Sequence, residues 1–242
     1  MTGASLRNHI VKVALATAAV GLFVAPDAHA TLAIQFAAGG STLTIQDNGV
    51  GDTNPALGAI GVASGTVVDG YTINNAGAVG FPTTGTATSP NIDVSSLAVT
   101  NTGAPGTLTV LLSQTDFLNS GLTSFSGAVG GTEQTQSLAY SAFYNGTDTL
   151  FGTGTQIDGT LTFTNPSPGG LFPFSGSVSG LINTTAPYSL TERIVINSTG
   201  TGQTVSFDAN LVGTAVPEPA SIAIFGTALL GLGWAARRRR KA

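Results

Sequence analysis

The chain has 242 residues, of which 33 are Gly, 11 are Pro and none is Cys, and only 8% carry a charged side chain. The absence of Cys excludes disulfide bonds, thiolate-ligated metal centres and thiol nucleophiles. Between positions 31 and 215, ten acidic residues accompany a single base, Arg193, so this part of the chain has a net charge of −9. Because a phosphate backbone is bound by clustered Lys and Arg, this charge argues against nucleic acid as a partner.

The first 30 residues have the order of a secretory signal peptide. Arg7 and Lys12 precede an uncharged, apolar run over 13–24, and the small residues Ala28 and Ala30 follow it. The run of twelve residues is too short to span a bilayer comfortably. An A-x-A pattern after such a run is typical of signal-peptide cleavage. We therefore predict export with cleavage after Ala30, while an uncleaved N-terminal membrane anchor stays open as the alternative.

Residues 31–215 form the predicted secreted domain, and these 185 residues are enough to bury a core without disulfides or metal. Thr, Val, Ser and Gly dominate, and no stretch shows the 3.6-residue apolar period of an amphipathic helix. Apolar and polar side chains alternate instead in four segments, 107–114, 159–164, 188–197 and 204–212. One apolar and one polar face are typical of antiparallel sandwich strands. We predict an all-β fold, either an antiparallel β-sandwich or a jelly-roll-like domain.

Clusters of turn-forming residues separate the predicted strands and recur at spacings that allow roughly ten strands. The clusters lie at 47–49, 74–77, 89–91, 165–170 and 198–200. The segment 51–80 is rich in Gly, Ala and Asn and has the weakest pattern. This segment is expected to form either a long loop or an irregular edge of a sheet.

One predicted strand carries a charge on its apolar face. In 188–197, strict alternation places Glu192 with the apolar side chains and Arg193 with the polar ones. Because a buried charge is costly without a partner, we expect either a bulge near Thr191 that shifts the register, or a position near an edge where Glu192 reaches water. A buried carboxylate with a catalytic role is the third interpretation.

The predicted secreted domain lacks the side chains that most enzymes use. It contains no His, Cys, Lys, Met or Trp. A Ser-His-Asp triad, a Ser-Lys dyad, a lysine Schiff base and a histidine-ligated metal are therefore excluded. Paired carboxylates, as in glycosidases, pass this test, but there is no Trp to stack on a sugar ring. We predict that the protein is not an enzyme and that it has no catalytic residue, no cofactor-binding residue, no metal ligand and no cofactor.

Two further features bear on binding. Asp47 and Asp52 lie in a short loop with Gly residues, which suits calcium chemically but fails the spacing of an EF-hand, so a plain turn is the simpler interpretation. Tyr140, Phe143 and Tyr144 lie in one short segment. If these rings were exposed beside two facing carboxylates, they would favour a carbohydrate-binding module.

The last 27 residues contain three parts in strict order. Pro217, Glu218 and Pro219 come first, and an uncharged segment over 220–236 follows. The chain then carries five basic residues, Arg237, Arg238, Arg239, Arg240 and Lys241. As a helix, the uncharged segment would be roughly 25 Å long, just short of a ~30 Å hydrocarbon core. We predict that it spans the inner membrane with its basic end in the cytoplasm, because positive charges stay inside.

This tail, VPEPASIAIFGTALLGLGWAARRRR, closely resembles the PEP-CTERM sorting signal of Gram-negative bacteria. The resemblance covers positions 216–242 and rests on the PEP triplet, the Ala-Ser after it, the Gly-Leu-Gly and the basic run. It implies export by the general secretory route, retention by the tail, and processing near the PEP motif by the membrane enzyme exosortase. It makes Pro217, Glu218 and Pro219 the recognition motif and Arg237 to Arg240 the retention charge.

The resemblance also implies a setting, since the family is linked to extracellular polysaccharide production and to biofilm or floc formation. We therefore expect an exported protein of the cell surface or extracellular matrix with a structural or interaction role. Its expected partners are exosortase, the inner membrane and extracellular polysaccharide. The alternative is a secreted carbohydrate-binding or carbohydrate-degrading module that uses paired carboxylates. A plain single-pass membrane protein with Pro-Glu-Pro as a stiff stalk also stays open.

Overall fold

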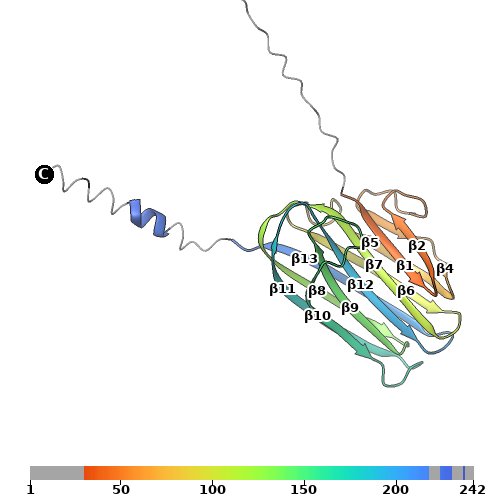
Figure 1. The fold of residues 1–242 in the computed structure, drawn as a ribbon. Coiled ribbons are helices and arrows are strands. Elements are labelled where there is room, and N and C mark those ends of the chain that lie inside the picture. Colours follow the sequence, from red (N-terminus) through yellow and green to blue (C-terminus); the bar gives the residue numbers. More distant parts are fainter. Residues whose placement is uncertain (1–29, 218–223, 231–236, 238–242) are drawn as a thin grey trace, which may run out of the picture.

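A computed structural model of the chain describes residues 30–217, 224–230 and 237. This part of the chain forms thirteen β-strands in two antiparallel sheets that pack face to face (Figure 1). The first sheet consists, in spatial order, of β10 (Thr155–Thr164), β9 (Ser137–Asn145), β12 (Tyr188–Ser198), β7 (Gly106–Phe117), β1 (Leu32–Ala38) and β2 (Ser41–Gln46). The second consists of β11 (Phe172–Thr184), β8 (Gly121–Glu133), β13 (Thr204–Ala215), β6 (Asn91–Asn101), β5 (Tyr71–Val79) and β3 (Ala59–Val62), with β4 (Thr66–Val68) also paired to β5. The predicted all-β fold is confirmed, and the two facing sheets are consistent with a β-sandwich.

The four segments with clear alternation all lie in strands, namely β7, β10, β12 and β13. In β13 the side chains of Val205, Phe207 and Leu211 are buried, while Ser206 and Asp208 on the other face are exposed. The weakly patterned segment 51–80 contains β3, β4 and β5, which form the edge region of the second sheet. The edge interpretation of that segment is therefore the correct one.

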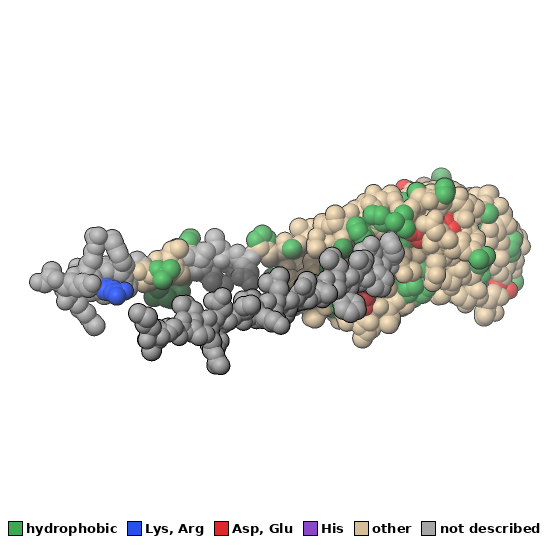
Figure 2. Space-filling view, turned by 90° about the horizontal axis from the view of Figure 1, so that it is seen from above, with side chains coloured by type: hydrophobic (Ala, Val, Ile, Leu, Met, Phe, Trp, Pro, Cys, Tyr) green, Lys and Arg blue, Asp and Glu red, His purple; other side chains and the backbone are tan. Residues whose placement is uncertain are grey.

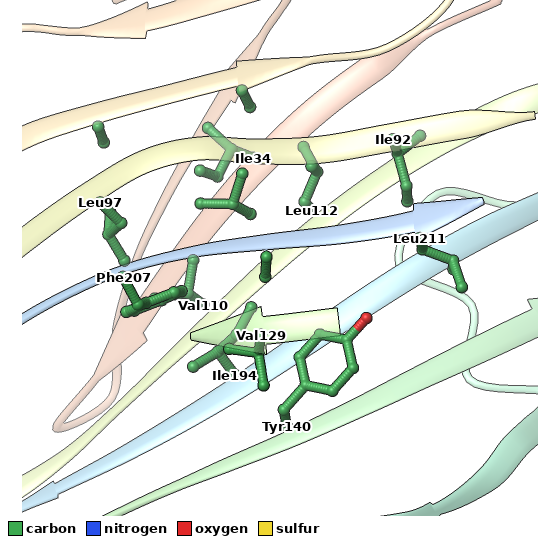
Figure 3. Close-up of a cluster of buried hydrophobic side chains, with 14 of the residues drawn as sticks. Ile34, Ile92, Leu97, Val110, Leu112, Val129, Tyr140, Ile194, Phe207 and Leu211 are labelled. Atoms are coloured by element: carbon green, nitrogen blue, oxygen red, sulfur yellow. The ribbon is translucent and has the colours of Figure 1, made fainter. Parts of the chain in front are cut away.

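The core lies between the sheets and is built from both of them (Figure 3). Ile34, Leu112 and Ile194 from the first sheet and Ile92 and Leu211 from the second are fully buried. Burial of such side chains supplies the main driving force for folding, at roughly 1.5–3 kcal/mol each.

Along one side, the edges of the two sheets meet. β10 and β11 are the edge strands there, and the backbone N–H of Ser179 in β11 donates to a carboxylate oxygen of Asp158 in β10 at 3.3 Å. The register of β10 against β9 shifts between Ile157 and Leu161. Asp158 sits in this bulge with φ of 65°.

The first strand of the sandwich, β1, starts at the same end at which the last strand, β13, finishes. β13 finishes where β8 begins, because Ala215 pairs with Thr123. β7 finishes there as well, since its connection to β8 is short, and Leu32 at the start of β1 pairs with Gln114 of β7. We call this the exit end, because the chain leaves it toward the C-terminal tail.

The predicted terminal segments are only partly described. Residues 224–230 are helical, and no helix among the described residues is long and apolar enough to cross a bilayer. The signal-peptide prediction over 1–29 and the remaining positions of the 220–236 prediction lie outside the described residues.

Candidate functional sites

A hollow of about 480 Å³ lies on the outer face of the second sheet, across β6, β8, β11 and β13. Its polar lining consists of Asp93, Ser175, Asp208 and Asn210, and the rest of the lining is small or backbone. Gly130 has no side chain to fill the space. The hollow is therefore a shallow polar depression in the middle of a sheet face.

Strand pairing brings the two carboxylates together. Asp93 of β6 pairs directly with Asn210 of β13. The register of β13 against β6 shifts between Phe207 and Ala209, where Ser95 and Ser96 of β6 lie opposite the single residue Asp208. Asp208 lies two positions before Asn210 on the same face of β13, so the exposed Asp208 is a diagonal neighbour of the half-buried Asp93.

The electrostatics of this hollow are those of two acids without a nearby base. Burial raises the pKa of Asp93, and the charge of Asp208 raises it further. The guanidinium of Arg193, the only base between positions 31 and 215, lies elsewhere, 4.9 Å from the ring centre of Phe143 on the first sheet. The carboxylates and the Asn210 amide together can accept hydrogen bonds from hydroxyl groups or hydrated cations.

The carboxyl group of Glu192 lies inside the sandwich. β12 is a central strand, and Glu192 pairs in register with Leu112 of β7 and Ala142 of β9. A register shift does occur nearby, between Tyr188 and Leu190, but it leaves Glu192 facing inward with an exposed fraction of 0%. A register shift thus lies near Thr191 as expected, but it does not move Glu192 off the inner face, and the expected position near an edge is wrong.

One hydrogen bond holds the Glu192 carboxyl group. The hydroxyl of Tyr140 donates to Oε1 at 2.8 Å, while Oε2 is buried and has no partner among the described residues. Burial raises the pKa of Glu192 to about 8, the Tyr140 hydrogen bond counteracts this, and the charge of Asp93 adds to it. Burial therefore favours the protonated form of Glu192, whose side chain does not reach the surface of the described domain.

A second buried acid was not singled out from the sequence. Glu133 at the end of β8 has an exposed fraction of 0%, and Thr135 donates to its Oε2 at 2.6 Å. Burial raises the pKa of Glu133 as well. The sequence around Glu133 shows no alternation of apolar and polar residues, whereas such alternation is what drew attention to Glu192.

The aromatic residues of β9 are buried. Tyr140, Phe143 and Tyr144 have exposed fractions of 0%, 5% and 8%. Tyr140 binds Glu192, Phe143 lies beneath Arg193, and the Tyr144 hydroxyl accepts the backbone N–H of Thr185 at 3.0 Å. They do not form the exposed sugar-stacking cluster that would have favoured a carbohydrate-binding module.

The acidic loop at 47–52 uses its carboxylates internally. Asp52 accepts backbone N–H groups of Asn48, Asn54 and Gly61 at 2.8, 2.8 and 2.9 Å. Asp47 accepts the N–H of Gly58 at 2.7 Å. No cluster of three or more potential metal-ligating side chains occurs among the described residues. These contacts brace the loop as a turn.

The residues of the predicted sorting motif fall at the boundary of the described chain. The N–H of Val216 donates to the carbonyl of Leu122 at 2.8 Å and closes the last rung of β13. Pro217 follows and is exposed. Glu218, Pro219, Arg238, Arg239, Arg240 and Lys241 lie outside the described residues, as does Ala28, while Arg237 is described as helical and Ala30 as half-buried.

The sequence of this tail matches a family model, the PEP-CTERM protein-sorting motif, over residues 215–240. The chain carries a PEP-CTERM sorting motif. The match begins at the last residue of β13, so the motif starts where the sandwich ends. The predicted recognition triplet and four of the five basic residues lie within the matched range.

No curated protein matches this sequence. Among solved structures, TmCBM61, determined in complex with β-1,4-galactotriose, matches at 8% identity over 65% of this chain and 87% of that chain, with a TM-score of 0.27. The carbohydrate-binding module TmCBM27, described for mannan recognition, matches at 9% identity over 74% of this chain and 99% of that one, with a TM-score of 0.25. The enzymatically active domain of bacteriophage CBA120 tailspike protein 4 matches at 10% identity over 60% and 21%, with a TM-score of 0.27. TM-scores this low do not establish a shared fold.

Proposed function

We propose that this protein is exported, held at the inner membrane by its C-terminal tail, and cut by exosortase near Pro217 to Pro219 to yield a surface or matrix protein. The PEP-CTERM match over 215–240 is the observation that carries this proposal. In the proposed order, the signal peptide is removed after Ala30, the domain 31–215 folds outside, and the segment 220–236 stays in the bilayer.

The structure of the boundary supports cleavage at this position. A protease needs an extended, unpaired segment, and the last described backbone pairing of the sandwich is that of Val216 with Leu122. Pro217 has no N–H to add to the sheet, and a second Pro follows at 219. Cleavage beyond Pro217 would therefore leave every strand of the sandwich intact.

The described part of the tail also suits a lipid environment. In the helix 224–230, Ile224, Phe225 and Leu230 have exposed fractions of 66%, 65% and 76%. Large apolar side chains exposed on a helix gain most from burial in hydrocarbon. This favours a membrane segment over a plain linker.

Intact-mass analysis of the surface fraction tests the sorting proposal. In a strain with exosortase, we expect a chain that begins at Thr31 and ends near Pro217 to Pro219. In a strain without it, the tail should remain attached. A variant with Pro217, Glu218 and Pro219 replaced by Ala should be exported yet stay in the membrane. Detection of the full basic tail on the mature protein of the exosortase strain would contradict the proposal.

For the sandwich itself, we infer a non-catalytic structural or interaction role within extracellular polysaccharide. Its net charge of −9 over 31–215 keeps neighbouring copies apart in solution. The face seen in Figure 2 is mostly neither apolar nor charged, with scattered acidic side chains. Such a surface suits a hydrated polymer network.

A second candidate function is direct carbohydrate binding in the hollow at Asp93 and Asp208. The pairing of two carboxylates with the Asn210 amide favours it, because such groups accept hydrogen bonds from sugar hydroxyls. Affinity electrophoresis tests this, with the protein run through a native gel that contains extracellular polysaccharide from the bacterium that makes it. If the hollow binds sugar, Asp208→Asn should weaken the retardation roughly tenfold. The control Asp158→Asn removes an exposed carboxylate outside the hollow and should not. Equal retardation of both variants would exclude the hollow.

A further inference from the structure

Large apolar side chains that stay exposed gather at the exit end. Within residues 30–217, eight such side chains are exposed, and only Val67 and Leu171 lie at the opposite end. The other six lie in the turns or strand ends of the exit end: Val50, Leu57, Leu118, Leu122, Leu181 and Val216. A distribution this uneven points to a surface that meets something apolar.

Three of these side chains surround the point where the chain leaves the sandwich. Val216 and Leu122 are joined by a backbone hydrogen bond of 2.8 Å. Leu181 is a diagonal neighbour of Leu122, because Asn183 pairs with Leu122 across β8 and β11. Their exposed fractions are 46% for Leu122, 64% for Leu181 and 38% for Val216. We call Leu122, Leu181 and Val216 the exit corner.

The exit corner is also hollowed. A depression of about 380 Å³ lies beside it, lined by Leu122, Ala215, Val216 and Pro217 together with Ser120, just before β8, and Asn183 of β11. This depression lies where the chain leaves the sandwich, at Val216 and Pro217, and is separate from the acidic hollow at Asp93 and Asp208. Apolar groups can therefore enter at the place where the tail begins.

The tether to the tail is very short. Only positions 217–219 separate Val216 from the start of the uncharged segment at 220. Four residue steps span at most about 14 Å even when fully extended. If 220–236 sits in the bilayer, as in the proposed function on which this inference rests, the exit corner is held at the membrane surface. A tether of this length gives an effective concentration of millimolar or more, so weak contacts persist.

We propose that the exit corner contacts the lipid interface, so that the precursor's sandwich rests on the bilayer with its exit end down. Val50 supplies a second contact, since it has an exposed fraction of 98% at the tip of the loop braced by Asp47 and Asp52. The contact is apolar, and it ends when exosortase cuts the tail.

The charge of this end decides which lipid it meets. Asp47, Asp52, Asp116 and Asp148 lie in turns or strand ends of the exit end, and no Lys or Arg occurs among the described residues there. An anionic surface would repel these acids. The proposed surface is therefore zwitterionic lipid, and added anionic lipid should weaken the contact.

The absence of Cys makes a direct measurement simple. Full-length precursor is reconstituted in phosphatidylcholine vesicles with a single nitroxide label at Leu122→Cys, Leu181→Cys or Val50→Cys. Matched labels at Val67→Cys and Leu171→Cys report on the opposite end, where exposed fractions are 61% and 71%. We expect exit-end labels to collide at least threefold less often than the controls with a water-soluble paramagnetic quencher, and to gain collisions with oxygen. Equal accessibility at both ends would overturn the inference.

Three additional measurements distinguish lipid contact at the exit corner from loss of membrane retention and from contact with exosortase. If the precursor does not float with vesicles in a density gradient, the proposed membrane retention fails, whereas flotation with water-exposed labels refutes only the exit-corner contact. Protection that appears only when exosortase is added would assign the corner to that enzyme and overturn the lipid contact. Inserting ten Gly/Ser residues after Val216 leaves the exit corner intact and should reduce the protection, because a longer tether lowers the effective concentration.

Discussion

The pKa of Glu192 is raised to about 8 because its carboxyl group is enclosed between the two sheets. Tyr140 of β9 is its hydrogen-bond donor, and Asp93 of β6 is the charged group that acts on it from the second sheet. No cation compensates it among the described residues, and burial therefore dominates its titration.

This residue makes stability depend on pH. Below its ordinary pKa of 4.5 the carboxyl is protonated in both the folded and the unfolded chain, so it costs nothing extra. Between 4.5 and about 8 the unfolded chain releases the proton while the folded chain keeps it, which favours unfolding. Stability should therefore fall as pH rises through this window, by on the order of 4 kcal/mol, and level off above it. Glu133, whose pKa is also raised, contributes in the same direction.

Replacing Glu192 with Gln should remove most of this dependence. The amide can still accept the Tyr140 hydroxyl and cannot ionise. Urea denaturation of the domain 31–215 should show Glu192→Gln more stable than the parent by roughly 3 kcal/mol at pH 8, and within about 1 kcal/mol of it at pH 4.5.

Asp158→Asn is the matched control, because it removes an exposed carboxylate of the first sheet. Glu192→Gln should flatten the slope of stability against pH, and Asp158→Asn serves as the comparison for the loss of one carboxylate. A parent protein whose stability rises between pH 4.5 and pH 8 would show that Glu192 is ionised in the core.

At the level of the strands, β8 depends on a close approach at Gly131. This residue pairs with both Phe207 of β13 and Phe174 of β11. A Cβ at Gly131 would lie 2.7 Å from the Cα of Phe207 and overlap the carbonyl oxygen of Ser206. The glycine therefore allows β8 to sit centrally between two strands.

Gly131→Ala should consequently loosen the second sheet. We expect a loss of at least about 2 kcal/mol and a melting temperature lower by roughly 4–8 °C, because backbone atoms must move to admit the methyl group. Gly159→Ala in the edge strand β10 is the control, since its Cβ would meet no described atom within 4 Å. If both variants had the same change in melting temperature, β8 and β13 would be able to move apart and accept the methyl group without loss of stability.

Alternation was sufficient to locate β7, β10, β12 and β13, because each has one face in the core and one face toward solvent or a polar neighbour. It could not locate β3, β4 and β5, where Gly, Ala and Asn give little contrast between faces. The acidic hollow also escaped prediction. Asp93 and Asp208 are 115 positions apart in the sequence, and only the pairing of β6 with β13 brings them together.

At the scale of the whole molecule, basic and acidic residues are separated along the chain. Seven of the eight bases lie in the first twelve or the last six positions, while ten of the twelve acids lie between 31 and 215. Those seven basic residues thus belong to the two predicted sorting segments, and those ten acidic residues belong to the sandwich. This division explains why the sorting motif was recognisable from sequence while the partner of the sandwich was not: a linear signal is read in order, whereas a binding face is assembled by folding.

The basic run can be tested as the retention element. Because each cation at the bilayer centre costs at least ~2.5 kcal/mol on insertion scales, replacing Arg237 to Arg240 and Lys241 with Ser should weaken the stop. Some chains should then appear in the medium with uncut tails, as measured by intact mass. Replacing the four arginines with Lys keeps the charge and should retain the chain like the parent. Unchanged retention of the Ser variant would leave the apolar segment alone as the anchor.

The bulged edge of β10 limits how copies of this protein can join. An edge strand with free backbone groups can template the addition of another chain, and a bulge with an outward acid disrupts that ladder. Here Asp158 caps Ser179 of the opposite sheet and closes this side of the sandwich. Released molecules crowded in a matrix would accordingly remain separate particles at this edge rather than polymerise into cross-β fibres.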